Sequence, residues 1–171
     1  MDKTPRTTVT ISCLCGQVAL EAVGAPIASV VCYCDDCQEG ARQLRSLPNA
    51  VPIEEPTGGT GYLAYRKDRV RPVKGAALLR PLKIRKDSAT NRVIATCCNA
   101  PMLLNFDDGK HWVDLYRSRC HDHVPPVQMH ICTKFKSEGR TIPTDAPQYP
   151  RHPVSLLMKL VLAKAAMVLR L

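Results

Sequence analysis

The chain has 171 residues, of which 45% are apolar, so it is long enough for one domain with a real core. The formal net charge is +9, but seven thiolates binding two divalent ions would reduce it to about +6, which indicates only a mildly basic surface. Nine cysteines, an odd number, exclude complete disulfide pairing within one chain. The first residues lack the apolar stretch of a secretory signal, and with the clustered thiols this predicts the cytoplasm.

Most of the chain has the pattern of short β-strands separated by turns. Alternating and β-branched residues predict strands over 7–12, 17–22, 28–33, 61–64, 77–79, 82–84, 92–96, 101–106, 111–116 and 127–135. The first two strands form a hairpin around Cys13-Leu14-Cys15-Gly16, and residues 107–110 close another hairpin. A short helix is expected over 40–45, followed by a loop over 47–61 that is rich in Pro and Gly.

The last 18 residues, 154–171, differ from the rest because they favour a helix and are almost entirely apolar. They are marginally short for a membrane span and carry Lys159, Lys164 and Arg170. We therefore expect a β domain over 1–153 with an appended helix that packs on it or on a second copy of the chain in a homodimer. A helix lying on a membrane surface stays open as an alternative.

The cysteines fall into three clusters, each at an expected turn: Cys13/Cys15, Cys32/Cys34/Cys37 and Cys97/Cys98. Zinc binds thiolates in a tetrahedron, with four protein ligands in structural sites and an open position in catalytic ones. The seven thiols divide naturally into a closed set of four and an open set of three. The sequence thus predicts two zinc ions per chain.

Four segments carry a resemblance to a known family: 12–16, 32–38, 97–102 and 143–149. In their order and cysteine spacing they resemble the glutathione-dependent formaldehyde-activating (GFA, CENP-V-like) family. The resemblance implies a mainly β, Mss4-like fold of several small antiparallel sheets around two zinc sites. It also implies a structural zinc on Cys13, Cys15 and the late pair, and a catalytic zinc on Cys32, Cys34 and Cys37.

The chain departs from the family pattern at two places. Tyr33 stands where the family usually has His, and the late C-x-x-C motif is reduced to Cys97-Cys98, with Ala95 at the position of its first cysteine. Cys97 must then supply the missing thiolate. Adjacent residues point to opposite sides of a strand, so both thiols reach one ion only at a turn. Asn99 replaces the usual Gly, and Asn tolerates left-handed backbone.

The resemblance implies a zinc-dependent carbon–sulfur lyase-like enzyme that acts on glutathione-type thiol adducts of formaldehyde or a related small electrophile. An open zinc would bind the thiol and lower its pKa. Basic residues could hold the carboxylates of the thiol, although a solvated basic face explains them equally well: Arg66, Lys67, Arg69 and Arg71. Asp35 and Asp36 are candidates for a base, or belong to a solvated turn.

A non-catalytic, zinc-stabilised binding module for a protein or nucleic-acid partner is the alternative. A fourth protein ligand at the triplet, such as Cys120, His121 or His123, would favour it. Nucleic acid is not the expected partner, because the basic run 66–86 has only Tyr65 nearby for base stacking. Isolated cysteines usually act as small core residues, which is what we expect of Cys120 and Cys132.

Overall fold

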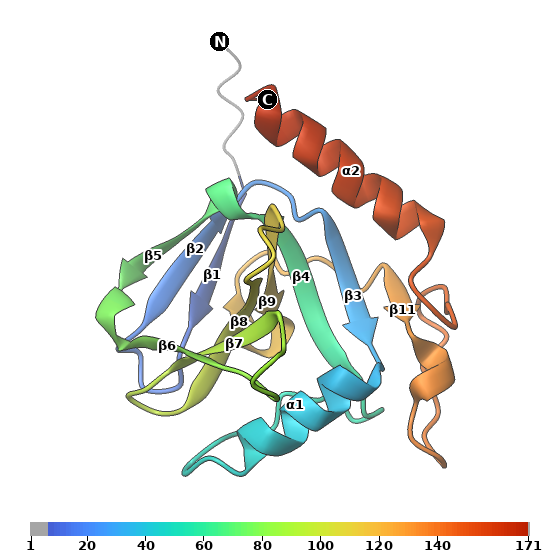
Figure 1. Ribbon diagram of the computed structural model, residues 1–171, viewed down its shortest axis with the longest axis horizontal. Helices are drawn as coiled ribbons and strands as arrows, with labels where there is room; N and C mark the ends of the chain where they lie inside the picture. Colours follow the sequence, from blue (N-terminus) through green and yellow to red (C-terminus); the bar gives the residue numbers. More distant parts are fainter. Residues whose placement is uncertain (1–6, 171) are drawn as a thin grey trace.

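The computed structural model describes residues 7–170 and shows a mainly β protein built on two sheets (Figure 1). The strands are β1 (Thr8–Ser12), β2 (Ala19–Val23), β3 (Ala28–Cys32), β4 (Thr60–Arg66), β5 (Val70–Lys74), β6 (Leu79–Leu82), β7 (Thr90–Ala95), β8 (Ala100–Phe106), β9 (Trp112–Tyr116), β10 (Cys120–His121) and β11 (Met129–Ile131). The helices are α1 (Asp35–Arg45) and α2 (Val154–Val168). One sheet has the order β10-β1-β2-β5, and the other has the order β11-β3-β4-β9-β8-β7-β6.

The predicted fold class is confirmed, and so are both predicted hairpins, β1–β2 and β8–β9. Neighbouring strands are antiparallel except for β11, which runs parallel to β3 at the edge of the larger sheet. A parallel pair needs a long connection, and here residues 33–128 separate the two strands. The larger sheet is therefore mixed.

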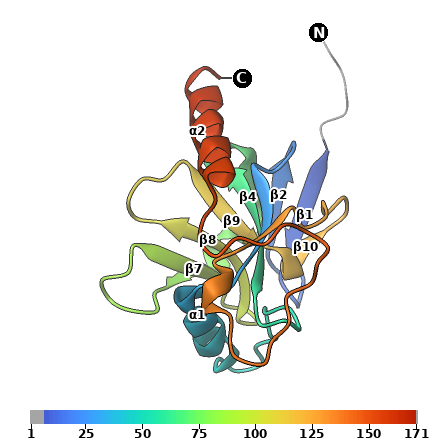
Figure 2. The same cartoon turned by 90° about the vertical axis from the view of Figure 1, so that its right-hand side faces the viewer.

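The centre of the seven-stranded sheet is buried on both faces, as the burial of residues 60–65 of β4 shows, whereas the edge strand β6 is mostly exposed. One face packs on the four-stranded sheet, where alternating residues of β1 and β2, such as Val9, Ile11 and Leu20, meet Leu63 and Leu115. The opposite face carries a second core that includes residues of α1 and α2. Figure 2 shows the two helices at opposite ends of that second face.

Several predicted elements were wrong in extent. In place of the strands expected over 77–79 and 82–84, the structure has a 3-10 turn over Ala76–Leu78 and one strand, β6. The helix expected over 40–45 begins at Asp35, directly after Cys34, with two acidic residues in its first turn. Negative charge there is favourable because the amino end of a helix is electropositive. The strand expected over 127–135 ends at Ile131, because Cys132 adopts a left-handed backbone (φ 59°) and a 3-10 turn follows.

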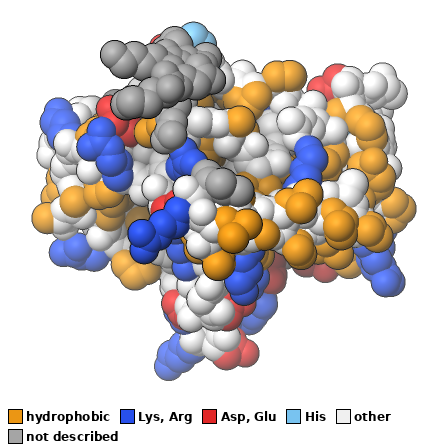
Figure 3. Space-filling view, turned by 90° about the horizontal axis from the view of Figure 1, so that it is seen from above, with side chains coloured by type: hydrophobic (Ala, Val, Ile, Leu, Met, Phe, Trp, Pro, Cys, Tyr) orange, Lys and Arg blue, Asp and Glu red, His pale blue; other side chains and the backbone are white. Residues whose placement is uncertain are grey.

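The helix α2 lies over the edge of the molecule with one face turned inward. Leu156 is buried and Leu160 is partly buried against the second core, whereas seven other large apolar side chains of the C-terminal segment are exposed: Val154, Leu157, Met158, Val161, Leu162, Val168 and Leu169. Figure 3 shows apolar side chains gathered on the side where α2 lies. Among the described residues, no helix has the length and apolar character needed to cross a membrane.

Candidate metal centres and the adjoining cavity

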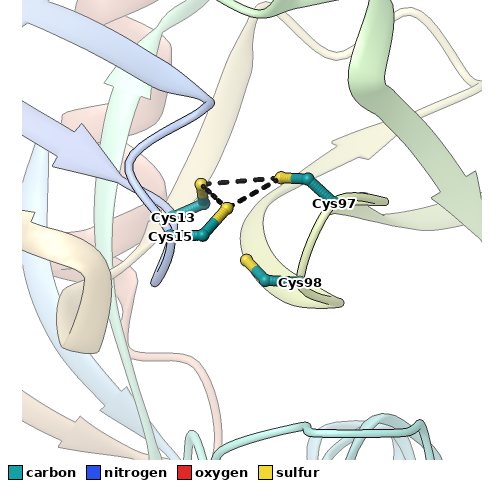
Figure 4. A group of neighbouring side chains, drawn as sticks. All are labelled: Cys13, Cys15, Cys97 and Cys98. Atoms are coloured by element: carbon teal, nitrogen blue, oxygen red, sulfur yellow. Dashed lines mark hydrogen bonds between the residues drawn. The ribbon is translucent and has the colours of Figure 1, made fainter.

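The first cluster, called here the four-cysteine cluster, joins the two sheets. Cys13 and Cys15 lie in the β1–β2 turn, and Cys97 and Cys98 lie in the β7–β8 turn, with all four sulfur atoms within 4.8 Å of one another (Figure 4). The Cys15–Cys97 sulfur distance is 3.3 Å, Cys13–Cys15 is 3.6 Å and Cys13–Cys97 is 3.8 Å. A zinc tetrahedron with bonds of about 2.3 Å has sulfur–sulfur edges of about 3.8 Å, so this donor set fits zinc.

The backbone explains how adjacent cysteines share one cluster. Cys97 and Cys98 occupy a tight turn rather than a strand, and Asn99 has the left-handed φ of 54° that the turn requires. The expectation that Asn stands in for Gly at this position is confirmed. The turn rotates both thiols toward the β1–β2 hairpin, so Cys97 takes a place in the cluster.

Hydrogen bonds distribute negative charge unevenly over the four thiols. Burial opposes ionisation of Cys13, but the Val18 N–H and the neighbouring thiols donate to its sulfur and lower the pKa of Cys13 to about 7. Desolvation, with hydrogen bonds to Cys15 and Cys13, raises the pKa of Cys97 to about 12. A divalent cation would allow all four thiolates to form together.

The second cluster, called the three-cysteine cluster, is built on the junction between β3 and α1. Cys32 ends β3, Cys34 is the residue before α1, and Cys37 lies in the first helical turn. Their sulfur atoms also lie within 4.8 Å of one another. The spacing C-x-C-x-x-C therefore places one thiol on a strand end, one at the helix cap and one on the inner helix face.

Hydrogen bonds favour ionisation of Cys34 over the other two thiols of this cluster. Hydrogen bonds from Cys32 and Cys37, together with the Cys37 backbone N–H, lower the pKa of Cys34 to about 2. A hydrogen bond with Cys32 lowers the pKa of Cys37, but the bond to Cys34 and burial outweigh it and raise that pKa to about 12. The electropositive amino end of α1 also favours a negatively charged thiolate at Cys34. The cluster is thus prepared to receive a cation.

Two residues beside this cluster, Cys132 and His152, could not be placed there from the sequence, because they lie far from the three cysteines along the chain. The parallel pairing of β11 with β3 places Ile131 opposite Cys32, and Cys132 follows directly. A hydrogen bond with Cys132 is the main cause that raises the pKa of Cys32. The Cys132 sulfur also lies 3.7 Å from His152 Nδ1. Cys132 is buried as expected of a core residue, but its thiol faces the cluster.

A cavity of about 320 Å³ adjoins the three-cysteine cluster, and all three of its cysteines line the wall. The floor is the outer face of the seven-stranded sheet, α1 closes one end, and Leu156 and Leu160 of α2 cover another part. Most of the lining is apolar, with Arg92, Lys110 and Asp114 among the polar exceptions. Burial raises the pKa of Asp114 to about 7, against an opposing hydrogen bond from Trp112. The cavity is large enough for a small organic molecule.

Several residues proposed from the sequence lie away from this site. None of the four cations proposed to hold carboxylates lines the cavity: Arg66, Lys67, Arg69 and Arg71. Arg66 pairs with Asp68, and Arg71 pairs with Glu21. The residues considered as a fourth ligand join neither cluster within residues 7–170: Cys120, His121 and His123. Asp36 does line the cavity, and its carboxylate pairs with Arg85.

Comparison with known proteins places the chain in a family. Residues 8–113 match the family described as glutathione-dependent formaldehyde-activating enzyme. The chain belongs to this GFA family. A crystal structure of a Rhodobacter sphaeroides protein is similar at 15% identity and a TM-score of 0.47, covering 68% of this chain and 91% of that chain. No curated protein matches the chain. All seven clustered cysteines lie within the GFA match, whereas Cys132 and His152 lie beyond it.

Proposed function

We propose that the protein is a zinc-dependent carbon–sulfur lyase-like enzyme acting on thiol adducts of formaldehyde or a related small electrophile. The observation that supports this proposal is that the two clusters differ in their position relative to the cavity. The three-cysteine cluster forms part of a cavity wall, whereas no cysteine of the four-cysteine cluster lines that cavity. An incomplete ligand set beside a cavity suits a reactive metal, and a complete set between two sheets suits a structural one.

When bound at the three cysteines, zinc would lower the pKa of an incoming thiol and favour its thiolate. In the forward reaction, the sulfur electron pair forms a bond to the aldehyde carbon, the carbonyl π pair moves to oxygen, and the oxygen takes the proton that the thiol released. The product is a hydroxymethyl thioether, and the reverse reaction breaks the same carbon–sulfur bond. The apolar cavity wall, including Leu104 and Ile131, excludes water from the reacting thiolate.

Replacing Cys34 tests this proposal. Cys34 is the least buried thiol of the three-cysteine cluster, so Cys34→Ser should leave the fold largely intact. We expect it to abolish hydroxymethyl-glutathione formation above the uncatalysed rate, followed by NMR with glutathione and labelled formaldehyde. Cys120→Ala, a thiol outside both clusters, is the matched control and should retain the activity. Equal activity of Cys34→Ser and wild type would refute the proposal.

A second candidate, a non-catalytic zinc module, is favoured by the position of Cys132. Its thiol forms a hydrogen bond with Cys32, so Cys132 could supply a fourth sulfur ligand to the same ion. X-ray absorption of the zinc-loaded Cys13→Ser/Cys15→Ser variant counts the ligands of the remaining site. Three sulfur neighbours and a lighter atom support the enzyme, whereas four sulfur neighbours support the module.

A further inference from the structure

Arg92 is a cation buried in the cavity wall. It is only 3% exposed, although arginine is rarely buried to that degree without a partner. Strand pairing aligns Arg92 with Leu104 on β8, and Leu104 with Asp114 on β9. Residues directly opposite one another share a sheet face, and all three residues line the cavity. Arg92 therefore belongs to the face that carries the proposed reaction.

The guanidinium is held against α1, next to the three-cysteine cluster. Its Nη2 donates to the backbone carbonyl of Asp36, the residue before Cys37. The helix has glycine at the point of contact, because a Cβ added to Gly40 would lie 2.0 Å from Arg92 Nε. Gly40 thus leaves room for the guanidinium beside the first half of α1, and Cys34 and Cys37 lie at the start of the same helix.

The Nη1 atom of Arg92 is shielded from solvent and has no hydrogen-bond partner within residues 7–170. No carboxylate in that part of the chain forms an ion pair with Arg92; Asp36, for example, directs its carboxylate to Arg85. Leaving a charged donor buried without an acceptor is unfavourable. The structure therefore holds a cation whose acceptor is missing, in the wall of the cavity that the thiols line.

We propose that Arg92 binds the carboxylate of the substrate, so that the preferred substrate is a small thiol carrying a carboxylate near its sulfur. This inference rests on the proposed function, since it assumes that the thiol sulfur is bound at the three-cysteine cluster. A guanidinium matches a carboxylate better than a neutral oxygen, because its N–H groups form charged, paired hydrogen bonds. The cavity volume of about 320 Å³ suits a compact acid.

Two thiols of similar size distinguish the contribution of the carboxylate to binding from that of the sulfur: 3-mercaptopropionate and the neutral 3-mercaptopropanol. Titrated into the zinc-loaded full chain by calorimetry, the acid should bind at least about tenfold more tightly, the factor that one charge-assisted hydrogen bond supplies. Arg92→Gln should reduce this ratio to near one. The matched control is Arg85→Gln, an exposed arginine that also contacts Asp36 and lies outside the cavity lining, and it should keep the ratio.

A second variant guards against misfolding of Arg92→Gln. Gly40→Ala keeps the charge but displaces the guanidinium, so it should also remove the preference while zinc content stays at the wild-type value. Equal binding of both thiols to wild type, or a preference that survives Arg92→Gln or Gly40→Ala, overturns the inference. If Arg92 serves only to balance thiolate charge, Arg92→Gln should lower the zinc content and weaken the binding of both thiols equally. That result also overturns the inference.

Failure of the proposed function gives a different result, in which neither thiol binds. Binding of propionate, which lacks sulfur, then tests whether Arg92 binds a carboxylate independently of the thiol. Propionate binding that disappears in Arg92→Gln supports the carboxylate subsite without the thiol chemistry. The absence of propionate binding to wild type overturns the subsite as well.

Discussion

Replacing Cys97 by Ser tests whether the reduced late cysteine motif still completes a metal site. Cys97 lies 84 positions after Cys13, and the two thiols join the two sheets. A cross-link that closes a loop of this length removes unfolded-chain entropy worth about 4–5 kcal/mol. Losing the ion from the four-cysteine cluster should therefore reduce the free energy of unfolding by up to that amount, a large part of the total stability of a domain.

The assay combines elemental analysis with urea unfolding followed by circular dichroism. We expect Cys97→Ser to lower the zinc content from two ions per chain to one and to move the unfolding midpoint to lower urea. Leu14→Ser is the control, because Leu14 is an exposed side chain between Cys13 and Cys15 that contributes no thiol. It should keep both ions and change stability by less than about 0.5 kcal/mol.

A Cys97→Ser protein that keeps two ions and the wild-type midpoint would refute this reasoning. The late motif would then act through Cys98 alone, and the short Cys15–Cys97 contact would be incidental. A protein that loses one ion without losing stability would refute only the loop-closure argument. The two measurements therefore separate metal ligation from its contribution to folding.

Two further predictions concern contacts of the C-terminal third of the chain. A hydrogen bond from His130 holds the pKa of the Asp145 carboxyl below its usual 3.8, so the contribution of Asp145 to stability is present above that pH and is lost as the pH falls through the folded value. We expect Asp145→Asn to lower the melting temperature at pH 7, with a smaller difference from wild type at pH 3; a constant difference would contradict the assignment. His111, whose pKa is lowered by burial, bonds through Nε2 to the Leu160 carbonyl of α2 at 2.8 Å. His111→Ala should speed hydrogen exchange of α2 amides about fivefold, matching a loss of about 1 kcal/mol, and unchanged exchange would show that other contacts hold the helix.

Features that depend on neighbouring residues could be predicted from the sequence. The Cys13-x-Cys15 hairpin and the left-handed Asn99 follow from turn chemistry over a few residues, and the structure confirms both. The spacing of Cys32, Cys34 and Cys37 likewise brings their thiols together without help from the rest of the fold. The order of these motifs was also sufficient to indicate the family.

Features that depend on long-range pairing required the tertiary structure. Cys132 is adjacent to Cys32 only because β11 pairs in parallel with β3, and periodicity along the chain contains no information about that register. Arg92 was part of an expected strand, but its burial depends on Gly40, 52 positions earlier, and on the cavity between sheet and helices. The sequence alone therefore determined which thiols of each short motif lie together, because spacing within a motif is local. The tertiary structure decided which cluster adjoins a cavity and which cation stands beside it, because those contacts join segments that the chain itself keeps far apart.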